Sequence, residues 1–224
     1  MRIDILTLFP EMFAPLYSSI PARAQTAGKV QIELHNLRDY AAAPHHQVDD
    51  TPFGGGPGMV LKPEPLAAAL QSIQDEEKDK PARVIYLSPQ GIPLTQRLAE
   101  ELSQLPRLLL VCGHYEGIDE RIIDKYIDME VSIGDYVLSN GELGAMVLSD
   151  AVIRLLDGVI ASDSAAQESF STGILDHPHY TKPAIFEGMA VPEVLLSGNH
   201  KHIEAWRQEQ ALAATKRKRP DLLQ

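Results

Sequence analysis

The 224-residue chain contains a single cysteine, Cys112, so an intramolecular disulfide is excluded. No apolar run approaches the length of a membrane-spanning helix, and Met1–Asp4 leads directly into an alternating strand pattern instead of a secretory leader. We therefore expect no membrane association and a reducing, cytoplasmic environment. The composition, 44% hydrophobic and 23% charged, is that of an ordinary globular protein.

Two common nucleotide-binding motifs are also missing. No G-x-G-x-x-G follows a predicted strand, and no G-K-[ST] occurs anywhere in the chain, which excludes a Rossmann fingerprint and a P-loop. A nucleotide hydrolase that binds phosphates through Gly54–Gly58 stays a rival hypothesis, although the missing Lys-Ser/Thr counts against it. Cys112 itself ends an apolar run, and no neighbouring residue has the character of an activating base, so we interpret it as a buried apolar residue.

Positive charge is scarce, since the formal net charge is −11. Lysine and arginine supply most non-specific affinity for nucleic acids, so the overall balance argues against a general nucleic-acid binder. The distribution is uneven, however: residues 201–224 carry six Lys/Arg against three Asp/Glu. We expect this basic segment to bind a phosphate backbone locally, with an affinity that falls as salt rises.

The hydrophobic patterns predict an α/β protein with a parallel sheet flanked by helices. Alternating or apolar runs predict strands at Ile3–Leu8, Val30–Leu34, Val84–Leu87, Leu108–Cys112 and Met129–Ile133. Helices are predicted from Pro10, at Pro63–Glu77, Leu94–Ser103 and Leu143–Leu156, and at roughly Asn199–Lys216. For the helix at Leu143–Leu156 we expect an inward face that carries Met146, Val147, Asp150, Ile153 and, in part, Arg154.

Glycines follow three of these strands. Because the strand at Val84–Leu87 is joined to Leu108–Cys112 through a helix, the two form a parallel pair with a right-handed crossover. The loops that leave parallel strands meet at one edge of the sheet, and glycine lets backbone groups approach a ligand closely. We therefore predict that Tyr86–Pro89, Gly113–Gly117 and Ile133–Gly141 converge on one pocket. Ser88–Gly91 is expected to leave its strand as a turn.

The long polar segment Asn36–Lys62 has no periodicity and contains a cluster of glycines before Met59. A loop of this length is usually functional or disordered, so we consider both a substrate-contacting flap and a flexible connector. The pair His45 and His46 lacks a third ligand at metal spacing and is interpreted as polar loop residues, or at most phosphate contacts.

Two long motifs carry a family resemblance. Cys112–Arg121 (CGHYEGIDER) and Ser132–Leu143 (SIGDYVLSNGEL) closely resemble the signature segments of bacterial tRNA (guanine-N1)-methyltransferase. Further segments resemble the same family in the same order: Leu8–Phe13, Val48–Met59, Tyr86–Gly91, Ser169–Tyr180 and Arg219–Leu223. The resemblance implies a knotted methyltransferase of the SPOUT class, with a deep C-terminal-side trefoil knot and a small helical C-terminal domain. Nothing in the periodicity itself indicates a knot, which general folding rules disfavour.

The resemblance also implies an activity, the transfer of a methyl group from S-adenosylmethionine to N1 of guanosine 37 in tRNA. It implies a homodimer with shared active sites, and three regions in each chain. These are a methyltransferase domain at 1–160, a linker at 161–173 and a small tRNA-binding domain at 174–224. The Ala/Ser-rich segment from Ile160 to Gln167 fits the linker.

Individual residues take roles by the same resemblance. The methyl donor is expected to contact Tyr86, Leu87, Ser88, Pro89, Gly113, Tyr115, Glu116, Gly117, Ile133, Gly134, Asp135, Tyr136, Val137, Leu138 and Gly141. Glu168 is expected to be the catalytic base, Arg154 the partner of guanine O6, and Asp176 a substrate-binding carboxylate and the reserve candidate for the base. The family usually has Asp where this chain has Glu168. It usually has Gly at the position of Asn140, and often Pro at that of Gly144.

A rival from another functional class is a non-catalytic RNA-binding module with a vestigial donor pocket. The presence of both Arg154 and an acid at position 168 counts against it, because a binder needs neither. His177 and His179 lack thiolate partners, so we expect no zinc there. The sequence pattern gives no indication for or against a dependence on Mg²⁺.

Overall fold

The computed structural model describes residues 1–160 and 168–223. Contacts within the chain define two compact units, residues 1–160 and residues 161–224, and each is described by itself. Among the described residues, no helix is both long and apolar enough to cross a membrane.

The first unit is built on a five-stranded, wholly parallel sheet in the order β2-β1-β6-β5-β7. Its strands are β1 (Arg2–Thr7), β2 (Gln31–Asn36), β5 (Arg83–Pro93), β6 (Arg107–Cys112) and β7 (Met129–Ser132). The central strand β6 is buried at every position, as expected for a parallel strand covered on both faces. The predicted α/β class, with helices flanking a parallel sheet, is confirmed.

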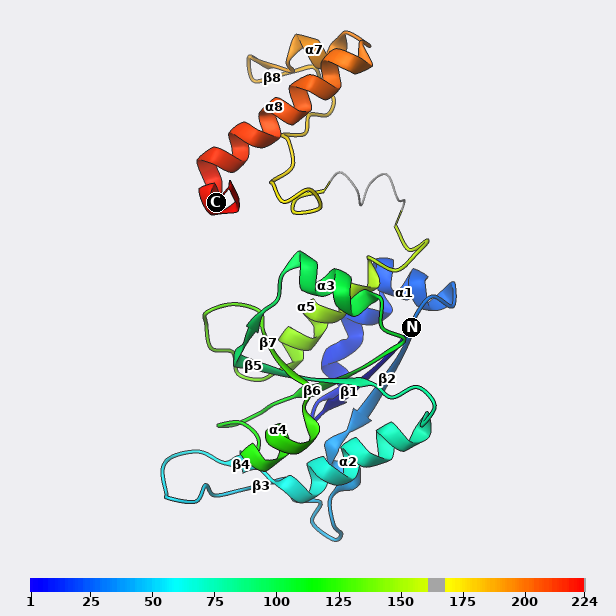
Figure 1. The fold of residues 1–224 in the computed structure, drawn as a ribbon, viewed down its shortest axis with the longest axis vertical. Helices are drawn as coiled ribbons and strands as arrows, with labels where there is room; N and C mark the ends of the chain where they lie inside the picture. Colours follow the sequence, from blue (N-terminus) through cyan, green and yellow to red (C-terminus); the bar gives the residue numbers. More distant parts are fainter. Residues whose placement is uncertain (161–167, 224) are drawn as a thin grey trace. The chain divides into compact units, whose positions relative to one another are not determined.

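Helices cover both faces of this sheet (Figure 1). One layer contains α2 (Pro63–Glu76) and α4 (Glu120–Tyr126). The other contains η1 (Pro10–Tyr17), α1 (Ser19–Thr26), α3 (Gln96–Ser103) and α5 (Glu142–Ile153). Each layer encloses its own apolar core. The short helices α1 and α4 were not predicted, because one or two turns give too little periodicity to detect.

The predicted inward face of α5 is wrong at two positions, since Val147 and Asp150 are exposed. The buried side chains of this helix include Ala145, Leu148 and Val152. Most residues of α5 are apolar, so the apolar stripe is too broad to fix the rotation of the helix from sequence.

The segment Ser88–Gly91 does not leave β5 as the predicted turn. The strand continues to Pro93 with a shift in its register against β7 between Leu87 and Ile92. A Cβ atom at Gly91 would lie 2.3 Å from the backbone nitrogen of Val131, so only glycine permits this approach. The absent side chain therefore keeps the irregular strand on the sheet, which a turn signal alone does not reveal.

The long segment after β2 also has more structure than predicted. It contains the short helix η2 (Leu37–Tyr40) and an antiparallel pair formed by β3 (Asp49–Asp50) and β4 (Val60–Leu61). In β4, the Leu61 N–H also donates to the carbonyl of Gly117 at 3.0 Å. This hydrogen bond connects the base of the loop to the segment between β6 and α4.

A buried ion network joins β1, β2 and β6. Arg107 is buried, and its Nε lies 2.8 Å from Oδ2 of Asp4. Burial acts to raise the pKa of Asp4, but hydrogen bonds from His35, Arg2 and Arg107 outweigh it and hold the pKa below its ordinary value. The carboxylate therefore stays charged in the folded protein, which gives the buried Arg107 guanidinium a counter-ion.

The second unit contains a small hairpin and a long helix. The hairpin is β8 (Ile185–Phe186) with β9 (Met189–Ala190), followed by α7 (Glu193–Leu196), α8 (His200–Lys218) and η3 (Pro220–Leu223). Residues 161–167 of the predicted linker lie outside the described residues. Next to them, a tight turn is closed by a hydrogen bond from the Phe170 N–H to the Ile174 carbonyl at 2.8 Å.

Candidate active site

A cavity of about 240 Å³ lies beside Tyr86–Pro89 of β5 and the loops that follow β6 and β7, the three segments that the sequence predicts to converge. All three contribute to its wall, which agrees with the predicted convergence of the loops. In parallel α/β sheets, ligands bind at the carboxyl ends of the strands. Tyr136 and Val137 of its wall are 54% and 88% exposed. A concave site with apolar wall residues and a few polar groups is typical of small-molecule binding.

The inner wall of the cavity is largely backbone. A Cβ atom at Gly141 would lie 2.9 Å from Cα of Cys112, and one at Gly134 would lie 2.3 Å from the ring of Tyr136. Gly134 also has a φ of +151°, a backbone conformation that residues with a side chain rarely adopt. The Gly141 N–H donates to the Gly113 carbonyl at 2.9 Å, which holds two of the loops together.

Tyr86 is a buried residue of the cavity wall with a polar group at the end of its ring. A Cβ atom at Gly113 would lie 2.6 Å from the Tyr86 hydroxyl, so glycine makes room for the phenol. Burial, with a smaller contribution from the negative charge of Glu130, raises the pKa of Tyr86 to about 12. The phenol is therefore neutral at physiological pH and is available as a hydrogen-bond donor.

Below the cavity, Glu142 begins α5 and is 1% exposed. One of its carboxylate oxygens accepts a hydrogen bond from the Thr7 hydroxyl at 2.6 Å. Burial, and then the nearby charge of Glu142, raises the pKa of the Cys112 thiol well above its ordinary value. Cys112 is thus an unreactive, buried thiol next to the cavity-lining Gly113, in agreement with its apolar surroundings.

The predicted donor-binding residues all line this cavity except Asp135, which is exposed and does not contribute to the wall. Asp135 was predicted only because it lies inside a motif, and a motif does not show which of its side chains meet the cavity. The wall also contains six residues that were not named individually as donor contacts. Three of them, His114, Ser139 and Asn140, lie inside the segments predicted to form the pocket, whereas Val131, Ser132 and Gly144 lie outside them. Val131 and Ser132 directly precede Ile133 and Gly144 is three residues beyond Gly141, so the ends of a motif do not mark the edge of the cavity.

The glycine-rich loop reaches this wall at one point. A Cβ atom at Gly58 would lie 2.3 Å from Oε1 of Glu116, and the Glu116 N–H donates to the Met59 carbonyl at 3.0 Å. The loop tip extends beyond this contact, and Phe53 is fully exposed there. The flap therefore contacts the candidate donor site, while its tip remains free to meet another molecule.

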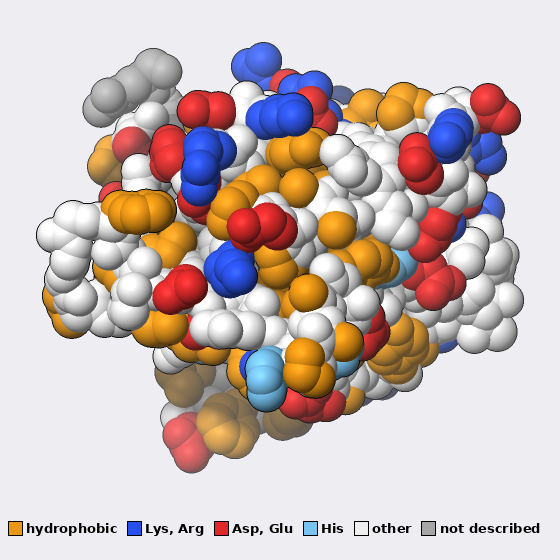
Figure 2. All heavy atoms as spheres, turned by 90° about the horizontal axis from the view of Figure 1, so that it is seen from below, with side chains coloured by type: hydrophobic (Ala, Val, Ile, Leu, Met, Phe, Trp, Pro, Cys, Tyr) orange, Lys and Arg blue, Asp and Glu red, His pale blue; other side chains and the backbone are white. Residues whose placement is uncertain are grey.

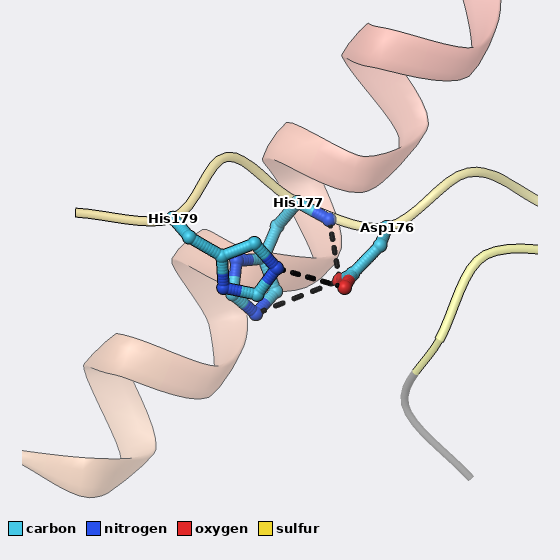
Figure 3. A group of neighbouring side chains, drawn as sticks. All are labelled: Asp176, His177 and His179. Carbon is cyan, nitrogen blue, oxygen red and sulfur yellow. Dashed lines mark hydrogen bonds and ion pairs between the residues drawn. The ribbon is translucent and has the colours of Figure 1, made fainter. Parts of the chain in front are cut away.

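The three predicted catalytic residues lie in different units. Arg154 follows the last turn of α5 in the first unit and is half-buried. Glu168 and Asp176 belong to the second unit, where each is also half-buried. Asp176 lies beside His177 and His179 in a group shown in Figure 3.

The surface of the first unit carries charges of both signs. On the face seen in Figure 2, acidic, basic and apolar side chains are interspersed, and no continuous basic patch covers it. By contrast, Lys216, Arg217 and Lys218 form the last turn of α8 in the second unit. Positive charge is therefore concentrated near the C-terminal end, as the sequence indicates.

Comparison with known proteins then decides the family. The family model described as tRNA (Guanine-1)-methyltransferase TrmD matches residues 1–224. The chain belongs to the TrmD family. The proteins named tRNA (guanine-N(1)-)-methyltransferase from Chloroflexus aggregans and Macrococcus caseolyticus are 56% and 54% identical to it. Each alignment covers the whole chain and 88% or 92% of the respective relative. A protein of the same name from Bacillus cereus is 52% identical and is covered to 92%.

Most of the sequence motifs that resemble the TrmD family line or adjoin the cavity. Cys112–Arg121 and Ser132–Leu143 provide two parts of its wall, and Tyr86–Pro89 of β5, from the segment Tyr86–Gly91, provides the third. Gly144, where many members have Pro, packs against the Leu87 side chain, and a Cβ atom at this glycine would lie 3.3 Å from Cδ1 of Leu87. The motif Ser169–Tyr180 forms the part of the second unit that contains Asp176.

Proposed function

We propose that this protein is a tRNA (guanine-N1)-methyltransferase that transfers the methyl group of S-adenosylmethionine to guanosine 37. The observation that carries the proposal is the cavity at the sheet edge, built from the same segments that carry the TrmD resemblance. The donor provides the electrophilic methyl group, so the transfer itself requires neither a metal ion nor a nucleophilic side chain of the protein.

In the proposed reaction, N1 of guanine attacks the methyl carbon of the sulfonium. The bond between carbon and N1 forms as the bond between sulfur and carbon breaks, and the donor leaves as a neutral thioether. The N1 proton passes to a carboxylate, for which Glu168 is the first candidate and Asp176 the reserve. A carboxylate base that faces a weakly acidic N–H contributes about 10²–10⁴ in rate.

Negative charge builds on O6 of guanine as the N1 proton leaves. We assign Arg154 to stabilise this charge, because a guanidinium offers several fixed donors and keeps its positive charge at any physiological pH. The alternative role for Arg154 is an ordinary ion pair at the end of α5.

For the donor, the cavity offers backbone groups and a few side chains. Leu87 and Leu138 provide apolar wall, and Tyr86 provides a neutral hydroxyl. Glu116 also lines the cavity and offers an acidic side chain for the positively charged sulfonium. A cationic donor and a neutral thioether product would differ in their attraction to this carboxylate, which favours release of the product.

We further propose that the chain acts as a homodimer with shared active sites, in which the donor pocket of one subunit is served by Glu168 of the partner subunit. Large apolar side chains near the cavity mouth are exposed in the single chain, among them Val137, Leu143 and Val147. Leu143 and Val147 are one helical turn apart on α5, and an exposed apolar patch is typical of an interaction surface. A dimer that covered them would bury these groups and complete the site.

Two finer features of the fold belong to the same proposal. We propose the trefoil knot of the SPOUT class, which is supported by the match to the TrmD family over the whole chain. We also propose that the domain at 1–160 binds the donor, that 161–173 links it to 174–224, and that this last domain binds tRNA through its basic helix end. Since its substrate is tRNA, we place the enzyme in the cytoplasm.

The deciding experiment uses undermodified tRNA and methyl-labelled donor. We expect label to enter tRNA that carries guanosine at position 37 and not the same tRNA with that guanosine replaced by adenosine. Binding of both tRNAs without transfer to either would instead support the alternative, an RNA-binding module with a vestigial donor pocket. Equal labelling of both would contradict the assigned position.

A further inference from the structure

A group of three side chains in the second unit has the composition of a metal site. Asp176, His177 and His179 come from one short loop, and one ligand atom of each lies within 4.8 Å of the others (Figure 3). Nε2 of His179 is 2.9 Å from Oδ2 of Asp176, and Nε2 of His177 is 3.7 Å from Oδ1. Ligands about 2.0–2.1 Å from a tetrahedral zinc ion stand roughly 3.3 Å apart, so these two separations lie on either side of that value, and the three ligand atoms are all within 4.8 Å of one another.

The ring of His177 is oriented as a metal-binding imidazole commonly is. Its Nδ1 is 3.2 Å from the Pro178 carbonyl oxygen, and because a carbonyl only accepts, this hydrogen bond favours the tautomer with the proton on Nδ1. In the neutral ring, Nε2 then presents its lone pair on the side of Asp176. Metal-bound histidines commonly donate their second ring N–H to a backbone carbonyl in this way.

The loop is held in place before any ion binds. The Leu175 N–H donates to the Thr215 hydroxyl of α8 at 2.9 Å, and the Asp176 N–H donates to the Ser169 hydroxyl at 3.0 Å. The side chain of His177 is 14% exposed, whereas that of His179 is 71% exposed. One side of the group is therefore fixed against the unit, and the other is open to solvent.

We propose that Asp176, His177 and His179 bind one divalent transition-metal ion of the zinc class, with solvent water in the remaining position. Two imidazoles with one carboxylate favour such ions over Mg²⁺, which prefers oxygen ligands. His179 would bind through Nε2 as its Nδ1–H tautomer, which breaks its present hydrogen bond to Asp176. The pair of histidines seemed unsuited to a metal from spacing alone, because the sequence did not indicate that Asp176 completes the group.

A second group of acid and imidazole side chains, Asp4, His35 and Glu76, carries no such proposal. Arg2 and Arg107 already occupy the carboxylate of Asp4 through ion pairs. A cation placed there would compete with two guanidinium groups, so that group is a structural ion network.

The only tryptophan of the chain makes this proposal testable without any enzymatic assay. The ring of Trp206 lies 6.4 Å from that of His177, so a paramagnetic ion at the site should quench its fluorescence. We expect Co²⁺ and Ni²⁺ to quench the full chain saturably at one ion per chain. Excess Zn²⁺ should reverse the quenching, and the same concentration of Mg²⁺ should not.

Variants locate the ion. His179→Asn and Asp176→Asn should each weaken Zn²⁺ binding by at least about tenfold in calorimetry, because each removes one of three protein ligands. His200→Asn is the matched control, since His200 is an exposed histidine of the same unit, and its affinity should equal that of the wild type. Circular dichroism of each variant should show an unchanged fold, which the high exposure of His179 favours.

Two outcomes would overturn the site. Wild-type affinity in His179→Asn would exclude this ligand set, and an equal loss in His200→Asn would show non-specific binding to surface histidines only. Since the readouts are fluorescence and heat, failure of metal binding leaves the proposed methyl transfer untouched. Conversely, a chain without methyltransferase activity still binds the ion if this inference holds.

Discussion

The two candidate binding regions are built in opposite ways. The cavity of the first unit is formed where glycines bring backbone segments together at the edge of a sheet. The candidate metal site of the second unit is formed by the side chains of Asp176, His177 and His179, in a loop that is hydrogen-bonded to α8. A backbone-built site is damaged by adding atoms, whereas a site built from side chains is damaged by removing them. Substitutions that add a side chain or remove one can therefore test this contrast.

Adding a side chain at Gly134 should nearly abolish donor binding. Valine would place Cβ against the Tyr136 ring and would adopt a φ that strains any β-branched residue. Strain and overpacking together correspond to a loss of about 10²–10⁴ in affinity. Calorimetry with S-adenosylmethionine measures it. Gly144→Ala is the matched control in the same wall, because its Cβ would lie 3.3 Å from the Leu87 side chain, and it should cost far less.

Removing the charge of Glu168 tests the opposite kind of damage. Glu168→Gln should lower turnover by about 10²–10⁴, because an amide cannot accept the N1 proton. Glu168→Asp should keep most activity, since the family normally uses the shorter acid. Single-turnover methyl transfer distinguishes the two variants. If Glu168→Gln is near wild type while Asp176→Asn is inactive, the base is Asp176.

Truncation of Arg154 should have a somewhat smaller effect. Arg154→Ala should reduce turnover by about 10²–10³ with little change in donor affinity, because the lost donor acts on charge that is present mainly in the transition state. Arg97→Ala is the control, since Arg97 is an exposed helix arginine paired with Glu101. Should both variants behave alike, Arg154 is an ordinary ion-pair residue.

The smallest expected effect is a partial rescue. Gly134→Val and Glu168→Gln homodimers should each be nearly inactive, but a mixed dimer has one site with an intact pocket and an intact acid. Random exchange makes about half of the dimers mixed, with one good site in two, so activity should return to roughly a quarter of wild type. The variants are refolded together from denaturant, and separately refolded samples are the controls. No recovery despite proven mixed dimers would contradict shared active sites.

Features of the backbone were easier to predict from the sequence than groups of side chains. The parallel sheet and the convergence of three loops were predicted because apolar runs and glycines leave a local signal in the sequence. The rotation of α5 was not predicted correctly at Val147 and Asp150. Most residues of this helix are apolar, so its apolar stripe does not show which face is buried. The strand irregularity at Gly91 depends on the backbone of β7, a strand that comes much later in the chain, which no local pattern reports.

Side-chain groups were the hardest to predict. The histidines of the Asp176 loop are separated by Pro178, and spacing alone did not indicate that both rings meet the carboxylate of Asp176. The ring orientation of His177 depends on a hydrogen bond to a carbonyl, which has no sequence signature. The catalytic residues were assigned entirely by resemblance, because an isolated Glu or Arg is common on any surface.

The reactivity of the single thiol, Cys112, measures how often this edge of the sheet opens. Cys112 is buried at the end of a central strand, with the backbone of Gly141 across it, and its raised pKa keeps it protonated. A thiol-specific reagent therefore reacts only with molecules in which this edge has transiently separated. The rate of labelling reports how often that happens, and a bound ligand that closes the loops slows the reaction in proportion to its affinity.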